Sequence, residues 1–208
     1  KRKTANLLLV GQNIEYKYTY NRLDKIIYPQ NPENNVNYYY GTAGNSDAAN
    51  DNAVGRLWYH VDATGTQFMK YGRLGELTLN RRSVAVPGDR VYWFQTEWTY
   101  DTWNRVKTIK YPDQELVTYK YNKGGELHAM TSEKNGTPNK DIISQLGYDK
   151  FGQRTYLRYG NGTETTYDYQ AERRRLDRMK VQSTTTYGAA NNRQFVNNKY
   201  NYDVLSNV

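Results

Sequence analysis

Pairs of aromatic residues spaced two positions apart return along the chain, and they constrain its fold more than any other feature. The pairs are Tyr18 and Tyr20, Tyr38 and Tyr40, Trp98 and Tyr100, Tyr119 and Tyr121, Tyr167 and Tyr169, and Tyr200 and Tyr202, with Met69/Tyr71 and Leu146/Tyr148 as weaker copies. We call the second member of each pair the anchor. Successive anchors lie 20, 31, 29, 21, 27, 21 and 33 residues apart. The recurring interval near 21 residues predicts an array of about eight repeats across residues 1–208.

The longer intervals coincide with segments that have the composition of loops. Residues 42–53 are nearly all Gly, Ala, Asn, Asp and Ser, and 188–199 are rich in Asn. Residues 80–91 contain Pro-Gly-Asp, and 133–141 contain Asn-Gly-Thr-Pro. Such clusters are typical of loops, so we expect four loop insertions in the array.

Side chains between the turn signals alternate with a period of two. Val117, Tyr119 and Tyr121 fall on one face of an extended segment, whereas Thr118 and Lys120 fall on the other. This alternation is typical of half-buried strands. We expect the aromatic pairs, together with Tyr148, to form a ladder of packed side chains across neighbouring strands.

Turn signals separate these strands. Gly75, Gly125 and Gly152 follow their anchors by four residues, where a tight reversal requires the positive φ that Gly tolerates. A second turn lies in the middle of the repeat, as at Pro112 and Asp113. Each repeat is therefore predicted to be a β-hairpin. Residues 170–180 contain good helix formers, but their place directly after an aromatic pair favours an extended turn that leads into a strand at 176–181.

The repeat resembles the YD repeat, also called the Rhs repeat. The segments that carry the resemblance are 147–154, which reads Gly-Tyr-Asp-Lys-Phe-Gly-Gln-Arg, and 159–169, with 98–121 and 55–77 similar to them. Some copies depart from the pattern: Gly41 follows Tyr40 directly, and Gln170 replaces the Asp. The resemblance covers essentially the whole chain.

The resemblance implies an all-β fold of tandem hairpins that form a curved, spiralling antiparallel sheet. Bacterial Rhs proteins, the B and C components of insecticidal toxin complexes, and teneurins have such shells. By this resemblance the chain is a non-enzymatic shell segment of a large secreted or cell-surface protein, from a bacterium. Its partners would be the remainder of its own shell and an enclosed C-terminal toxin domain.

We expect the chain to be a piece of a longer protein, truncated at both ends, because residues 202–208 end inside a repeat. About sixteen strands at about 4.8 Å each make a ribbon roughly 75 Å long. Closed into one ring, that ribbon would leave an interior of roughly 14 Å, which is too narrow for a folded domain. The terminal strands are expected to be exposed edges.

The residue inventory excludes several classes of site. The chain has no Cys and only two His, at 60 and 128, so we expect no catalytic thiol, no metal site and no cofactor. The Gly pairs lack the Lys-Ser or Lys-Thr of a phosphate loop. Asp101, Asp149 and Asp203 recur at one repeat position, where an Asp can accept hydrogen bonds from its own turn. No apolar run is long enough for a membrane helix, which needs about 20 residues.

The alternative function is a carbohydrate-binding or adhesion module that recognises cell-surface glycans. Trp103 lies in a turn and would stack on a sugar, and Arg173, Arg174 and Arg175 form a basic cluster in a chain of net charge +8. Nucleic acid is not expected as a partner, because Glu172 and Asp177 interrupt that cluster and the other charges are scattered.

Overall fold

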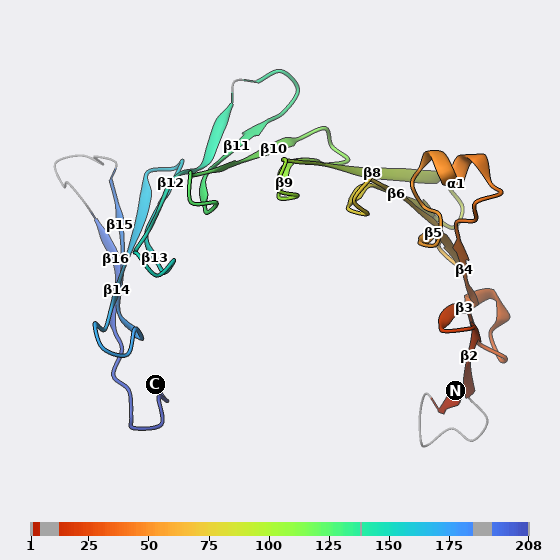
Figure 1. Cartoon of the computed structure of the whole chain (residues 1–208), viewed down its shortest axis with the longest axis horizontal. Coiled ribbons are helices and arrows are strands. Elements are labelled where there is room, and N and C mark those ends of the chain that lie inside the picture. Colours follow the sequence, from red (N-terminus) through yellow and green to blue (C-terminus); the bar gives the residue numbers. More distant parts are fainter. Residues whose placement is uncertain (1, 5–12, 138, 185–192, 208) are drawn as a thin grey trace. The chain divides into compact units, whose positions relative to one another are not determined.

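The computed structural model describes residues 2–4, 13–137, 139–184 and 193–207, and nearly all of its regular structure is β-strand. The strands are β1 (Arg2–Thr4), β2 (Asn13–Thr19), β3 (Arg22–Ile27), β4 (Val36–Tyr40), β5 (Leu57–Asp62), β6 (Gly65–Tyr71), β7 (Leu77–Ala85), β8 (Val91–Tyr100), β9 (Val106–Lys110), β10 (Leu116–Tyr121), β11 (Leu127–Glu133), β12 (Lys140–Tyr148), β13 (Arg154–Tyr159), β14 (Thr163–Tyr169), β15 (Leu176–Ser183) and β16 (Gln194–Lys199). Helix within the described ranges is confined to α1 (Ser46–Asn50) and a 3-10 turn, η1 (Pro32–Asn34). The predicted all-β fold is confirmed, and so is the strand after residue 175 (Figure 1).

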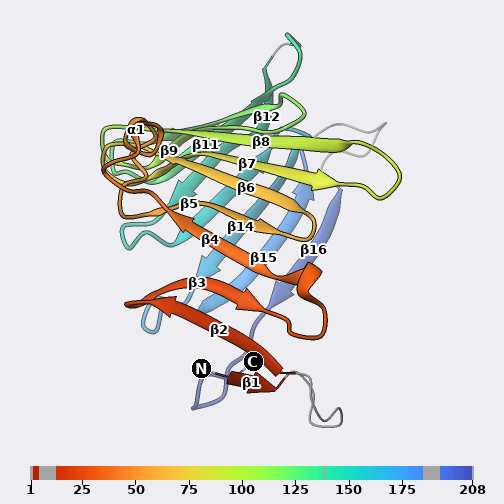
Figure 2. The ribbon, with the colours of Figure 1, turned by 90° about the vertical axis from the view of Figure 1, so that its right-hand side faces the viewer.

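Contacts divide the chain into two compact units. The first contains Lys1–Arg105 and Ile109–Asp113, and the second contains Val106–Thr108 and Gln114–Val208. In the first unit, β1 to β8 pair antiparallel in chain order, and Figure 2 shows β2 to β8 side by side. In the second unit, β10 to β16 do the same. Each unit is thus a meander of hairpins, the arrangement that short turns between alternating segments produce.

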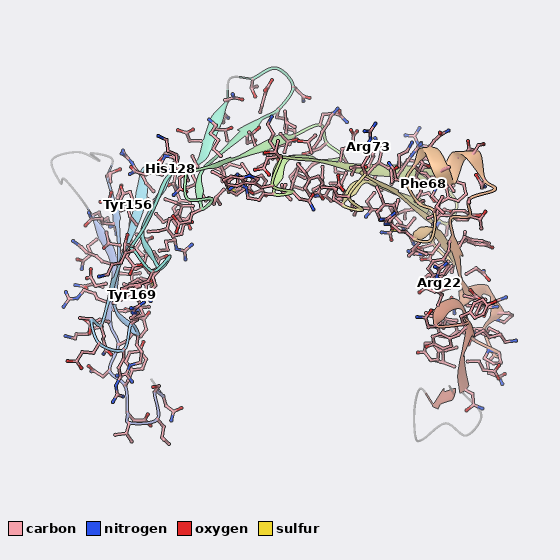
Figure 3. The ribbon with its side chains drawn as sticks, in the orientation of Figure 1. Arg22, Phe68, Arg73, His128, Tyr156 and Tyr169 are labelled. Carbon is pink, nitrogen blue, oxygen red and sulfur yellow. The ribbon has the colours of Figure 1, made fainter. Side chains whose placement is uncertain are left out.

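Each unit is a sheet one layer thick, with side chains on both of its faces (Figure 3). Among the described residues, the buried apolar side chains are mostly small, and no large side chain is fully buried. Leu157 is 4% exposed and lies opposite Leu146 on β12 and Thr165 on β14. Cross-strand rows of this kind, rather than a core between two layers, bury what apolar surface there is.

Two of the four expected insertions are partly strand. Within 80–91, only residues 86–90 lie outside strands, because β7 runs on to Ala85 and pairs with β8. Polar residues of this segment contact the facing strand of the hairpin. The Arg81 guanidinium, for example, lies 4.5 Å from the centre of the Trp93 ring. Within 188–199, residues 194–199 form β16, and 188–192 lie outside the described residues.

The other two insertions lie mostly between strands. Within 133–141, Glu133 ends β11, Lys140 begins β12, and residues 134–137 and 139 lie outside strands. Residues 42–53 contain α1, whose first turn is capped by the Asn45 side chain, which accepts hydrogen bonds from the amides of Asp47 and Ala48. Composition predicted a loop there, and the cap provides the local reason for a single helical turn.

The cross-strand row predicts that replacing a buried leucine by alanine lowers the free energy of unfolding more than replacing an exposed one. Leu157→Ala should lower the free energy of unfolding by about 2 to 3 kcal/mol, because a cavity would open between β12 and β14. Leu205→Ala is the matched control, since Leu205 is 79% exposed and should cost less than about 0.5 kcal/mol. Urea denaturation measures both values, and equal costs would contradict the proposed row.

Candidate functional site

The anchor tyrosines close the open ends of the hairpins. Tyr71 at the end of β6 donates its hydroxyl proton to the carbonyl of Leu57 at the start of β5, with an O to O distance of 2.6 Å. The same bond joins Tyr40 to Leu23, Tyr100 to Leu77, Tyr121 to Val106, Tyr169 to Arg154, and Tyr202 to Leu176, at 2.7 to 3.2 Å. Burial raises the pKa of Tyr71 and of Tyr100. Each bond ties the last residues of a hairpin to its first.

A register shift and a carboxylate-capped turn follow the anchor. The pairing shifts at the anchors Tyr71, Tyr121 and Tyr148. Such a bulge bends the strand and redirects the chain. The next residue then caps the turn: Asp149 accepts hydrogen bonds from the amides of Phe151 (2.8 Å) and Gln153 (2.9 Å). The same geometry is present at Asp101 and Asp203, so this recurring carboxylate holds turn backbone in each copy.

The position four residues after the anchor has a positive φ. Gly75, Gly125 and Gly152 have φ values of +92°, +89° and +75°, and Asn104 and Ser206 occupy the same place with +58° and +69°. A Cβ atom at Gly75 would lie 2.7 Å from the guanidinium of Arg56. Glycine there accommodates both the left-handed backbone and a side chain from the preceding repeat.

Neighbouring turns also contact each other. The side-chain amide of Gln153 donates a hydrogen bond of 2.8 Å to the carbonyl of Arg174 in the next turn. Arg175 donates to the Ser206 hydroxyl at 3.2 Å and lies 4.4 Å from the centre of the Tyr202 ring. The turns therefore form a linked row along one edge of the second unit.

Most of the other ladder residues occupy strand positions, but Tyr200 directly follows β16 and Tyr20 lies in a turn. Tyr38, Trp98, Tyr119, Tyr148, Tyr167 and Tyr200 are half-buried. Tyr119 lies opposite Met130, and Tyr167 lies opposite Met179. Tyr20 does not follow the expected ladder, because it lies in the tight turn between β2 and β3 with φ +55° and is 98% exposed. Its partner Tyr18 is 51% exposed.

The residues suggested for glycan binding are engaged in local contacts. Trp103 is 66% exposed, and the guanidinium of Arg105 lies 4.6 Å from the centre of its ring. Arg174 lies against the Phe151 ring, Arg175 bonds to the next turn, and Arg173 is exposed. Trp103 belongs to the first unit and the three arginines to the second.

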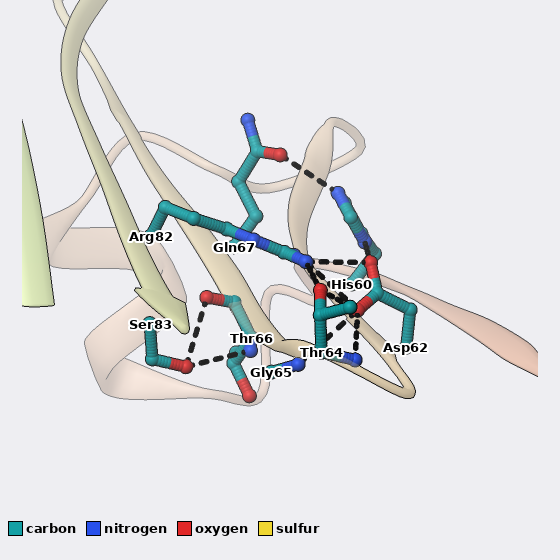
Figure 4. A network of polar contacts seen from close by, with 8 residues as sticks. All are labelled: His60, Asp62, Thr64, Gly65, Thr66, Gln67, Arg82 and Ser83. Carbon is teal, nitrogen blue, oxygen red and sulfur yellow. Dashed lines mark hydrogen bonds and ion pairs between the residues drawn. The ribbon is translucent and has the colours of Figure 1, made fainter. Parts of the chain in front are cut away.

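A half-buried polar network was missed by sequence reasoning (Figure 4). Asp62 on β5 accepts hydrogen bonds from the Arg82 guanidinium at 2.8 Å and from the amide and hydroxyl of Thr64 at 2.8 and 2.7 Å. Gln67 bonds to Nε2 of His60 at 2.9 Å. Arg82 belongs to a segment that composition predicted as a loop. Nothing in the neighbouring sequence indicates that it pairs with Asp62, twenty positions earlier.

The described part of the chain contains no candidate metal centre and no candidate membrane-spanning helix. No group of three or more His, Asp or Glu side chains among these residues could hold a metal ion. No helix of the same residues is long and apolar enough to cross a membrane.

Part of the chain is similar in sequence to known toxin subunits. No family model matches the chain. Over 88 residues, 42% of the chain, it is 31% identical to toxin subunit YenC1 of Yersinia entomophaga, and over 84 residues, 40% of the chain, it is 34% identical to toxin subunit YenC2 of the same organism. The chain is homologous to these toxin subunits. The predicted resemblance to toxin-complex components is therefore confirmed. The chain spans only 9% of the length of either relative.

Solved structures of toxin complexes share the fold. The crystal structure of TcdB2-TccC3-TEV superimposes with a TM-score of 0.77 over 94% of this chain at 18% identity. The Photorhabdus luminescens Tc holotoxin pore gives a TM-score of 0.77 over 94% at 19% identity. This chain covers 10% of each of those chains. The likeness to Tc toxins at this level of identity shows a common fold.

The tyrosine hydrogen bonds predict that removing one anchor hydroxyl lowers the free energy of unfolding. Tyr100→Phe should lower the free energy of unfolding by about 1 kcal/mol, because the Leu77 carbonyl loses its donor while the ring stays. Tyr20→Phe removes the hydroxyl of a fully exposed ring and should change stability by less than about 0.3 kcal/mol. Thermal unfolding compares the two variants. Equal effects would show that the hydroxyl bond does not stabilise the hairpin.

The Asp62 network predicts that the stability of the fold depends on pH. Burial alone would raise the pKa of Asp62, but hydrogen bonds from Arg82 and Thr64 outweigh it and lower that pKa from 3.8 to about 2. The ionised form therefore stabilises the fold by about 1 to 2 kcal/mol above pH 4, and this contribution is lost as the pH falls through 2.

Asp62→Asn tests this dependence through unfolding measured from pH 6 to about pH 2. The variant should be less stable than the natural chain at pH 6, and the difference should shrink on acidification. Arg82→Met should reduce the same pH dependence, because only the hydrogen bonds from Thr64 would then lower the pKa of Asp62. A stability difference that stays constant with pH would contradict the assignment.

Proposed function

We propose that the chain is a wall segment of a toxin-complex subunit whose complete form encloses a polypeptide toxin. The proposed partners are the remaining repeats of the parent protein and the enclosed C-terminal domain, and the proposed location is outside the cell that makes it. The observation that carries the proposal is the one-layer hairpin sheet of each unit in a chain homologous to toxin subunits.

A one-layer sheet suits a wall between two aqueous spaces. Both faces carry side chains, and the described residues of a unit form no second layer over either face (Figure 3). Each repeat is stabilised by its own anchor, its own turn and its neighbours, so an array of such repeats can be extended without a central core.

The proposed role is structural rather than enzymatic. Asp101, Asp149 and Asp203, the carboxylates that follow three of the anchors, accept amide hydrogen bonds in their own turns. Arg105 also donates to Asp101 at 2.7 Å, which adds to the structural use of that carboxylate.

Protection of the enclosed polypeptide tests the proposal in the full-length parent. Intact-mass analysis after protease treatment should find the C-terminal polypeptide of the parent whole under native conditions and degraded once the parent is denatured. Equal degradation under both conditions would overturn the enclosure.

A variant of the wall should weaken that protection. Gly152→Ala places a Cβ on a backbone with φ +75°, which costs about 1 to 2 kcal/mol. It should raise the fraction of degraded C-terminal polypeptide at a temperature near the unfolding midpoint. Gly44→Ala is the matched control, because no atom lies within 4 Å of the added Cβ there. Protection that is equal in the two variants would place residue 152 outside the wall.

A further inference from the structure

An aromatic pocket in the first unit is not accounted for by the proposed wall. It has a volume of about 420 Å³ and is lined by Thr19, Tyr20, Arg22, Asp24, Tyr38, Tyr39, Tyr40, Asn45, Trp58 and Tyr59. These residues come from the β2–β3 hairpin, from β4 and β5, and from the loop before α1. Arg22, one of the lining residues, is labelled in Figure 3. Six of the ten lining residues are aromatic.

A row of stacked rings ends at this pocket. Tyr39 and Tyr59 are stacked with their ring centres 4.5 Å apart and their planes 16° from parallel. Trp58 meets Tyr59 edge to face at 5.3 Å, and Phe68 meets Trp58 at 5.9 Å. Tyr39 is the last ring of the row on the side of β3, and it is 43% exposed. Tyr39 also lines the pocket, so part of its ring surface is open to a ligand there.

Polar groups of both charges surround that open surface. The guanidinium of Arg22 lies 5.2 Å from the centre of the Tyr40 ring, and the carboxylate of Asp24 accepts a hydrogen bond from the Thr19 hydroxyl. The side-chain oxygen of Asn45 accepts from two amides of α1, which leaves its amide hydrogens as donors. The pocket therefore offers donors and acceptors around an aromatic floor, with one positive and one negative charge.

We infer that this pocket binds a neutral sugar, with one pyranose ring stacked on Tyr39 and its hydroxyls bonded to Asp24, Asn45 and Arg22. A pyranose presents an apolar face of C–H groups and a rim of hydroxyls, which matches an aromatic floor with a mixed polar rim. A quaternary ammonium ligand would also suit a cage of aromatic rings. The guanidinium already present at the pocket and the net charge of +8 oppose a cationic ligand. This site involves neither Trp103 nor the Arg173 cluster, and it is independent of the enclosure of a toxin.

Saturation-transfer NMR with the 208-residue chain tests the site. The probes are the methyl glycosides of glucose, galactose and N-acetylglucosamine, each added alone, and choline chloride as the cationic probe. We expect transfer to the ring protons of at least one glycoside, with a dissociation constant in the millimolar range, and no transfer to choline.

Variants assign the binding to Tyr39. Tyr39→Phe keeps the ring and should retain the affinity within about twofold, whereas Tyr39→Leu should weaken it by about tenfold. Tyr111→Leu is the matched control, since Tyr111 is 39% exposed and does not line the pocket. Transfer to choline alone, absence of transfer to every glycoside, or equal binding by Tyr39→Leu and Tyr111→Leu would overturn the inference. A thermal unfolding curve of each variant establishes that it is folded.

Discussion

The open end of each hairpin is the weak point of a sheet that has only one layer. Without a second layer, no core pins the first and last residues of a hairpin together, and they would fray. The anchor hydroxyl bond, as from Tyr71 to Leu57, closes this end. Phenylalanine could cover the neighbouring strand but could not bond to its carbonyl. This requirement gives a physical reason for a chain with 22 Tyr and only 4 Phe.

The turn that follows the anchor makes the arrangement extendable. The bulge at the anchor redirects the strand, the Asp side chain at the next position replaces a missing backbone partner, and the positive-φ residue completes the reversal. Side chains such as Gln153 then reach the following turn. Stability is in this way distributed along the ribbon, with little apolar burial at any one place. A protein wall that faces water on two sides needs this distribution.

The parts of the structure that local chemistry determines could be predicted from the sequence. Period-two alternation, the anchor spacing and the Gly at plus four identified the hairpins, because each signal acts within a few residues. The Asp62–Arg82 pair, the exposed position of Tyr20 and the pocket beside Tyr39 could not be predicted. They depend on the register between strands and on where α1 lies, which the composition of 42–53 and 80–91 does not encode.

Electron cryo-microscopy of the full-length parent protein would test the central claim, that this ribbon is one layer of a container wall. The account predicts density one sheet thick for residues 13–183, with solvent on one face and a chamber that holds the C-terminal polypeptide on the other. A second sheet or a folded domain packed tightly against both faces of this segment, with no chamber beside it, would contradict the account.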